Sequence, residues 1–219
     1  MIMFSRYLRS ITIMSVAVSI VSAILLYPSL PDTIASHWNA SGEVDGETSK
    51  FWGVYLMPLI ITALSGLFLI LPKIDPLKRN YESFRNEYAQ MATVMLVFLI
   101  YIQGMIYAWN LGYRFEFTSA LFIGIGALLV FIGQVITRTK RNWFMGIRTP
   151  WTLSSDYVWN ETNRIGGKLF VIAGLITILS NFFLPENYVF PSFIVAIILV
   201  VLWTLLYSYH VYRGENNEK

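Results

Sequence analysis

The first of two polar segments that could carry chemistry spans residues 28–50 of this 219-residue chain. It contains His37 and Asn39, followed by Asp45. His37 and Asp45 could supply two metal ligands, or the carboxylate could orient His37 as a general base. Alternatively, His37 and Asn39 hydrogen-bond the loop backbone and hold a folded cap. No third ligand follows at a recognisable spacing, which favours the structural role.

The same segment is acidic, because four Asp and Glu residues are opposed only by Lys50 and leave a net charge of −3. A negative surface attracts cations or a basic peptide by long-range steering. Prolines, glycines and Asn39 favour turns here. We therefore expect an ordered loop with little regular structure.

The second polar segment, residues 138–168, interleaves aromatic and basic residues. Helix-capping residues followed by an acid predict a short interfacial helix from about Ser155 to Arg164, ahead of a glycine pair. One face of this helix would either bind a partner or pack under the protein. Arg148 could clamp a carboxylate or phosphate, although an arginine near a membrane more often pairs with lipid phosphate. The candidate partner-binding residues are Arg148, Trp151, Trp159, Asn160, Asn163 and Arg164.

The elements that must hold these segments follow from where charges are missing. About 20 apolar residues are enough to cross a bilayer core as a helix. Hydrophobic residues make up 56% of the chain and charged residues 13%, against about 25% charged in soluble domains. These features predict an all-α membrane protein, a six-transmembrane-helix bundle. The charge-free stretches are 10–31, 51–72, 88–113, 117–137, 169–185 and 187–209.

The short loops predict the side of the membrane on which each segment lies, since cytoplasmic loops retain Lys and Arg. With both termini in the cytoplasm, 14 of the 16 basic residues lie inside, and only Lys50 and Arg114 lie outside. The acidic segment is then external and the aromatic and basic segment cytoplasmic, about 30 Å of hydrocarbon apart, so the two cannot form one site. We expect a two-span region, 1–90, and a four-span region, 91–219, in one continuous bundle.

Small and amide side chains inside the spans predict packing contacts. Small residues let neighbouring helices approach closely. Amides should face the interior or lie near an interface, because an unpaired amide in hydrocarbon is costly. The small residues are Ser15, Ser19 and Ala23 in the first span and Gly126 and Gly133 in the fourth, and the amides are Gln103, Gln134 and Asn181.

An amphipathic helix is expected between the second and third spans. Asp75 and Pro76 have the residue types of an N-cap and a first helical position. The residues that follow place apolar side chains on one helical face that leads into the third span. These side chains are Leu77, Tyr81, Phe84 and Tyr88.

Several classes of function are disfavoured. The chain has no cysteine, which excludes disulfides, thiolate metal sites and a cysteine nucleophile. It has no Ser/His/Asp set, no zinc-protease His pair and no phosphate-binding Gly loop, so we expect neither an enzyme nor a cofactor. The net charge of +3 follows from the topology and does not indicate direct binding of nucleic acid.

Both polar segments resemble known families. The first is similar to a small membrane domain of unassigned role, through Pro31, His37, Asn39, Gly42, Asp45 and Gly46. The second resembles the signature of the SdpI family, through Asn142, residues 146–152, Trp159, Asn163, Arg164, Gly167 and Lys168.

This resemblance implies a membrane protein that protects its producer from a secreted sporulation-delay peptide toxin. In some members of the family it also implies that a transcriptional repressor is held at the membrane. The expected partners are the lipid bilayer, a peptide toxin outside and a cytosolic repressor inside. The alternative is a small-solute carrier or a membrane-integrity protein with no toxin role.

Overall fold

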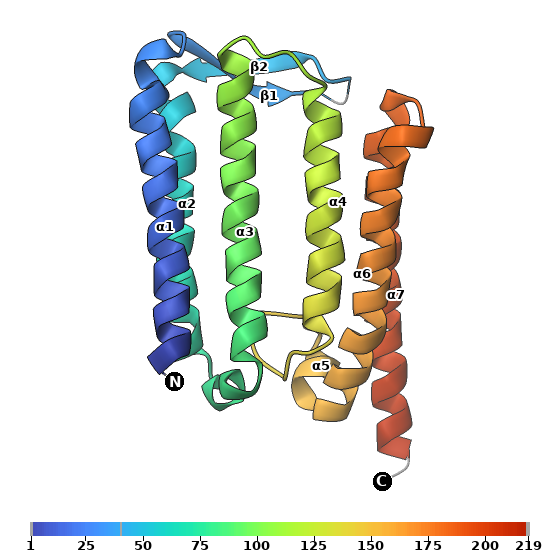
Figure 1. Cartoon of the computed structure of the whole chain (residues 1–219). Coiled ribbons are helices and arrows are strands. Elements are labelled where there is room, and N and C mark those ends of the chain that lie inside the picture. The colour runs from blue at the N-terminus through green and yellow to red at the C-terminus, as the bar shows by residue number, and fades with distance from the viewer. Residues whose placement is uncertain (1, 40, 218–219) are drawn as a thin grey trace.

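Six long helices run side by side in the computed structural model, which describes residues 2–39 and 41–217 (Figure 1). By length and composition, all six could cross a membrane, which confirms the predicted six-helix membrane protein. A strand pair crosses one end, the hairpin end, and the first and last helices have their outer ends at the other, the termini end. The long helices are α1 Ile2–Leu26, α2 Lys50–Ile74, α3 Tyr81–Asn110, α4 Phe117–Ile136, α6 Asp156–Phe183 and α7 Glu186–Asn217. The short elements are η1 Tyr27–Ser29, β1 Thr33–Trp38, β2 Val44–Ser49, η2 Lys78–Asn80 and α5 Pro150–Ser154.

The acidic segment has more regular structure than its turn-forming residues predict. Strands β1 and β2 pair antiparallel, with Thr33 opposite Ser49, and the Asn39 N–H donates to the Glu43 carbonyl at 2.9 Å to close the turn. The expectation of little regular structure was therefore wrong. The physical reason is a long-range contact, because Ile34 of β1 is completely buried against the first turns of α2.

The expected separate helix from Ser155 to Arg164 is also corrected. Ser155 does cap a helix, since its side chain accepts a hydrogen bond from the Val158 N–H, but that helix is α6 and continues through the glycine pair to Phe183. The helix packs closely on α4 at Gly167, where the missing side chain permits the contact. A Cβ on Gly167 would lie 2.5 Å from the Gly133 carbonyl oxygen. The short helix of this region is instead α5, which a capping box of Thr149 and Thr152 begins.

The C-terminal half, α4 to α7, is built on two such close approaches. Besides the contact at Gly133, a Cβ on Gly174 of α6 would lie 2.5 Å from the Gly126 carbonyl oxygen of α4. Backbones can approach this closely only where side chains are missing. The two glycines predicted as packing positions in the fourth span are therefore confirmed in that role.

The N-terminal half, α1 to α3, is joined by a buried polar network. The Ser19 hydroxyl donates to Gln103 Oε1 at 2.6 Å, and Gln103 Nε2 donates to the Tyr107 hydroxyl at 3.0 Å. That hydroxyl in turn donates to the Val54 carbonyl oxygen of α2 at 2.7 Å. The predicted interior positions of Ser15, Ser19, Ala23 and Gln103 are thus confirmed, whereas Gln134 and Asn181 lie in the last turns of α4 and α6.

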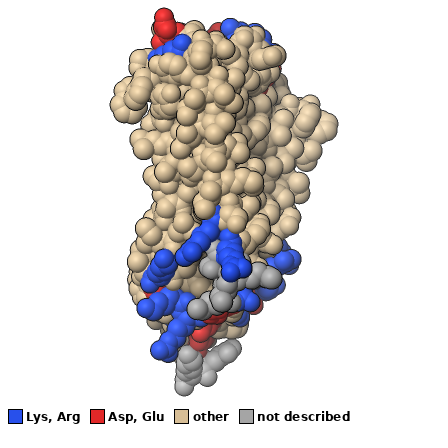
Figure 2. All heavy atoms as spheres, turned by 60° about the vertical axis from the view of Figure 1, so that its left-hand side comes forward, with Lys and Arg blue, Asp and Glu red and all other residues tan. Residues whose placement is uncertain are grey.

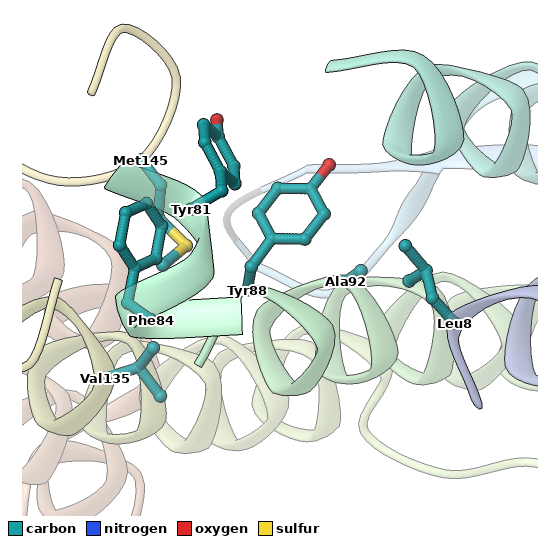
Figure 3. Close-up of a cluster of buried hydrophobic side chains, with 7 residues drawn as sticks. All are labelled: Leu8, Tyr81, Phe84, Tyr88, Ala92, Val135 and Met145. Carbon is teal, nitrogen blue, oxygen red and sulfur yellow. The ribbon is translucent and has the colours of Figure 1, made fainter. Parts of the chain in front are cut away.

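The halves meet at the termini end in a hydrophobic cluster (Figure 3). It joins α1, α3 and α4 with the loop that follows α4, and it buries the aromatic face predicted ahead of the third span. The helix begins later than expected, because α3 starts at Tyr81 and Asp75 instead follows α2 and accepts from the Leu77 N–H. The boundary expected at residue 90 lies within α3. The cluster consists of Leu8, Tyr81, Phe84, Tyr88, Ala92, Val135 and Met145.

Charge is distributed unequally between the two ends. On the face shown in Figure 2, Lys and Arg side chains gather at the termini end, and Asp and Glu occur at both ends. Lys50 and Arg114 belong to the hairpin end, as their places at the start of α2 and before α4 require. Lys219 lies outside the described residues.

Candidate functional site

The hairpin end exposes the histidine and carboxylate singled out from the sequence. His37 of β1 and Asp45 of β2 hydrogen-bond across the two strands through Nδ1 and Oδ1. The side chains are 70% and 44% exposed. They form a polar pair on the surface, where water screens them. Among the described residues, no three His, Cys, Asp or Glu side chains gather as a metal site would require.

Asn39 shapes the hairpin turn. Its Oδ1 accepts hydrogen bonds from the N–H groups of Ser41 at 2.9 Å and Glu43 at 3.0 Å, and its Nδ2 donates to the Glu43 carboxylate at 3.1 Å. An Asn side chain that binds the backbone two residues onward stabilises a turn. Asn39 thus has the structural role considered for it, and His37 adds a link between the strands.

A cavity of about 440 Å³ lies under the hairpin, between the two halves. Its walls are apolar side chains of α3, α4 and α7, including Ile106, Phe122 and Phe190, and His37 and Asn39 line its rim. Trp38 also lines it and stacks on Phe117 with ring centroids 3.6 Å apart. The Trp38 Nε1 atom is buried and has no hydrogen-bond partner among the described residues. The cavity therefore has an apolar interior beneath a polar rim.

Sequence reasoning missed Trp38 and the aromatic residues of this cavity. The signal was present, since Trp38 directly follows His37 and several aromatic residues occur at 109–122. These positions are far apart in sequence. Their meeting depends on how the hairpin folds over α3 and α4, which no spacing along the chain predicts.

The hairpin is fixed to both halves of the molecule. On α3, the Asn110 side chain accepts a hydrogen bond from the Ala35 N–H at 2.8 Å and donates to the Ala35 carbonyl at 3.1 Å. On α4, the Thr118 hydroxyl donates to the Asn39 carbonyl at 3.3 Å. The rim of the cavity is thus held by contacts with elements on either side.

At the termini end, Asn142 organises the loop between α4 and α5. Its side chain is 0% exposed. Nδ2 donates to the carbonyl oxygens of Lys140 and Met145, both at 2.8 Å, and Oδ1 accepts from the N–H groups of Phe144 at 2.9 Å and Met145 at 2.7 Å. Four hydrogen bonds from one buried amide fix the path of this loop.

Two candidate partner-binding residues, Trp159 and Asn163 of α6, are buried beneath the same loop and form hydrogen bonds to it. Trp159 is 0% exposed, and its Nε1 donates to the Thr139 carbonyl at 3.0 Å. Asn163 is 1% exposed, and its Oδ1 accepts from the Ile147 N–H at 2.8 Å. A Cβ on Gly146, which has φ +115°, would meet both of these side chains. This part of the motif is a scaffold.

The other four candidates lie nearer the surface and do not form one group with these two. Arg148 is exposed, and its Nη1 donates to the Trp143 carbonyl at 2.7 Å. Trp151 packs on Tyr209 of α7, with ring centroids 5.0 Å apart. Exposed Arg164 pairs with Glu161 at 2.6 Å, and the exposed Asn160 precedes that pair on α6.

Comparison with known proteins matches both polar segments. The model of the SdpI/YfhL protein family matches residues 138–208, and that of a domain of unknown function, DUF1648, matches residues 14–62. The chain is 28% identical over 209 residues to "Immunity protein SdpI" of Bacillus subtilis (strain 168), which covers 95% of this chain and 98% of that protein. No solved structure matches. With its six membrane-spanning helices, the chain is a multi-pass membrane protein that is similar to the SdpI/YfhL family over residues 138–208 and to an SdpI immunity protein along nearly its whole length.

Proposed function

We propose that this protein is a membrane immunity protein, which protects its cell by binding a secreted cationic or amphipathic peptide toxin at the hairpin end. The observation that carries the proposal is the acidic hairpin over an apolar cavity. The similarity to an immunity protein along nearly the whole of both chains supports it.

The proposal requires the hairpin end to face outward. Basic residues support this orientation, because they gather at the termini end and cytoplasmic loops retain Lys and Arg (Figure 2). The hairpin, in contrast, carries a net negative charge. A peptide arriving from outside would therefore meet the acidic surface first.

Binding would use the two features of the site in turn. Carboxylates of the hairpin, including Asp45, steer a cationic peptide by long-range attraction. Apolar side chains of the peptide then leave water and enter the cavity beside Phe122 and Phe190.

Protection of a sensitive cell tests the proposal. Cells that express the chain are challenged with sporulation-delay peptide toxin, and survival is compared at matched membrane abundance. Asp45→Asn and His37→Ala should each reduce protection, because they remove charge and rim geometry from an exposed pair. The matched control is Asp32→Asn, which removes the same charge from a fully exposed carboxylate that lies outside the strand pair and contacts Lys50 at 3.8 Å. A larger loss of protection in Asp45→Asn than in this control measures the contribution of the rim beyond its charge. Full protection by both hairpin variants at normal abundance would mean that the hairpin is only a cap.

The proposed role includes a cytosolic repressor held at the termini end. Tyr157, Asn160 and Arg164 support it, since they are exposed and share one face of the first turns of α6. A repressor that is captured by membrane vesicles should be lost with Asn160→Ala, while Arg213→Ala of α7 serves as the control for general loss of charge. If vesicles with either variant captured the repressor equally well, this surface of α6 would not be the binding site for the repressor.

A further inference from the structure

A second cavity, of about 490 Å³, lies at the termini end between the two halves. Its walls are apolar and flexible side chains, among them Met91 and Met95 of α3 and Phe170 of α6. Val201 and Leu205 of α7 also line it, and they are 53% and 42% exposed. The cavity therefore opens on the lipid-facing surface of α7, where an acyl chain can enter from the bilayer.

Arg148 is the only charged residue among the described residues that line this cavity. One of its guanidinium N–H groups donates to the Trp143 carbonyl at 2.7 Å, and no described carboxylate forms an ion pair with it. A guanidinium offers five donors in a planar fork that fits phosphate oxygens. Most of the donors of Arg148 are thus left for a ligand.

The buried carboxylate near this cavity, that of Asp75, already accepts hydrogen bonds from the chain itself. Asp75 is 2% exposed and accepts hydrogen bonds from the Leu77 N–H, the Tyr81 hydroxyl and the Trp143 N–H. Its oxygens bind the two connections together and do not pair with Arg148. The described residues thus leave the charge of Arg148 unpaired and available to an anionic ligand.

The backbone of the cavity floor adds donors of the same kind. The N–H groups of Gly146 and Arg148 have no acceptor among the described residues, although the N–H groups of Ile147 and Thr149 beside them do. The loop directly follows α4, so it lies at the level of the lipid headgroups. Free N–H groups beside a guanidinium favour an oxyanion.

We propose that this cavity is a binding site for one anionic phospholipid of the leaflet at the termini end, with an acyl chain between the halves and the phosphate on Arg148. A lipid satisfies both parts of the site, since the acyl chain covers the apolar walls and the headgroup supplies the missing negative charge. A free phosphate ion would leave the walls uncovered.

Native mass spectrometry of the full chain from lipid nanodiscs tests this site, with phosphatidylglycerol and phosphatidylcholine as the probes. We expect one phosphatidylglycerol molecule to be retained, and Arg148→Gln to lower that retention about tenfold, roughly 1.4 kcal/mol. Arg148→Lys should retain an intermediate amount, because the charge remains while the fork is lost. Lys140→Gln, which changes an exposed basic residue of the same loop outside the cavity, is the matched control and should have no effect.

A second pair of variants tests the acyl chain separately. Val201→Phe fills part of the cavity and should lower retention, whereas Val195→Phe on an equally exposed position of α7 outside the cavity should not. A site for free phosphate would not respond to this filling. Equal retention of the two lipids, or retention that neither Arg148→Gln nor Val201→Phe changes in a protein that remains folded, would overturn the proposal.

Discussion

The connections at the two ends of the bundle use the same side chain for the same task in different surroundings. The side-chain oxygens of Asn39 and Asn142 each accept two backbone N–H groups from residues that follow them. Asn39 is partly exposed in the hairpin turn, whereas Asn142 is completely buried. Water can replace a lost partner at the hairpin end but not at the termini end.

This difference separates two kinds of motif residue. At the termini end, the polar side-chain atoms of three motif residues form hydrogen bonds to the backbone of the chain itself. These residues, Asn142, Trp159 and Asn163, therefore stabilise the loop rather than contact a partner. At the hairpin end, His37 and Asp45 remain exposed. A motif that identifies a family therefore need not mark its binding surface, and burial is what distinguishes the two.

The largest expected effect concerns the side of the membrane on which each end of the bundle lies, because the hairpin end and the termini end should lie on opposite sides. Cysteines introduced by Ser41→Cys and Ser154→Cys, both at exposed positions, should react with a membrane-impermeant maleimide from opposite sides of the membrane. In intact cells only the Ser41→Cys variant should be labelled, and lysis should expose the other. Equal labelling of both in intact cells would contradict the six-span arrangement.

Removal of the buried amide should give the next largest effect. Asn142→Ala deletes four hydrogen bonds and leaves buried backbone groups unpaired, so we expect a loss of about 3 kcal/mol in the free energy of unfolding. Thermal unfolding in detergent measures it, and membrane abundance should fall as well. Asn160→Ala, at an exposed position on α6, is the control. Equal stability of the two variants would show that the loop does not depend on Asn142.

The substitution Trp159→Phe tests, with a smaller expected loss of stability, whether Trp159 has a structural role. It preserves most of the buried ring but removes the Nε1 donor, which leaves the Thr139 carbonyl without that bond. We expect a loss of about 1 kcal/mol in stability, measured in the same way, and no change in protection at matched abundance. A loss of partner binding without any loss of stability would instead favour a direct contact through Trp159.

Features with a local cause could be predicted from the sequence. The absence of charge identifies the six spans, since charge in the hydrocarbon core is costly whatever the fold. Small residues identify where another helix can approach α4. The close contact of α6 at Gly126 is possible because Gly126 has no side chain. The position of Gln103 in the interior follows from its polarity alone.

Features that depend on distant partners could not be predicted. Ile34 and Asn110 hold the hairpin, and neither indicates a strand by its own spacing. The glycine pair before Lys168 suggested a helix end, but α6 continues through it and packs there against Gly133 on another helix. The two cavities arise where the halves meet, so no single segment contains their signal.

The smallest expected change in stability completes the comparison between the two amides. Asn39→Ala removes the same kind of turn-forming bonds as Asn142→Ala, but water can reach the freed N–H groups, so we expect a loss of no more than about 1 kcal/mol in stability. Protection should nevertheless fall at normal abundance, because the turn shapes the rim of the cavity under the hairpin. Asn39→Asp, which keeps the accepting oxygen, should restore it in part. If Asn39→Ala destabilised the protein as much as Asn142→Ala, the hairpin would be a scaffold of the same kind, and the contrast between the two ends would fail.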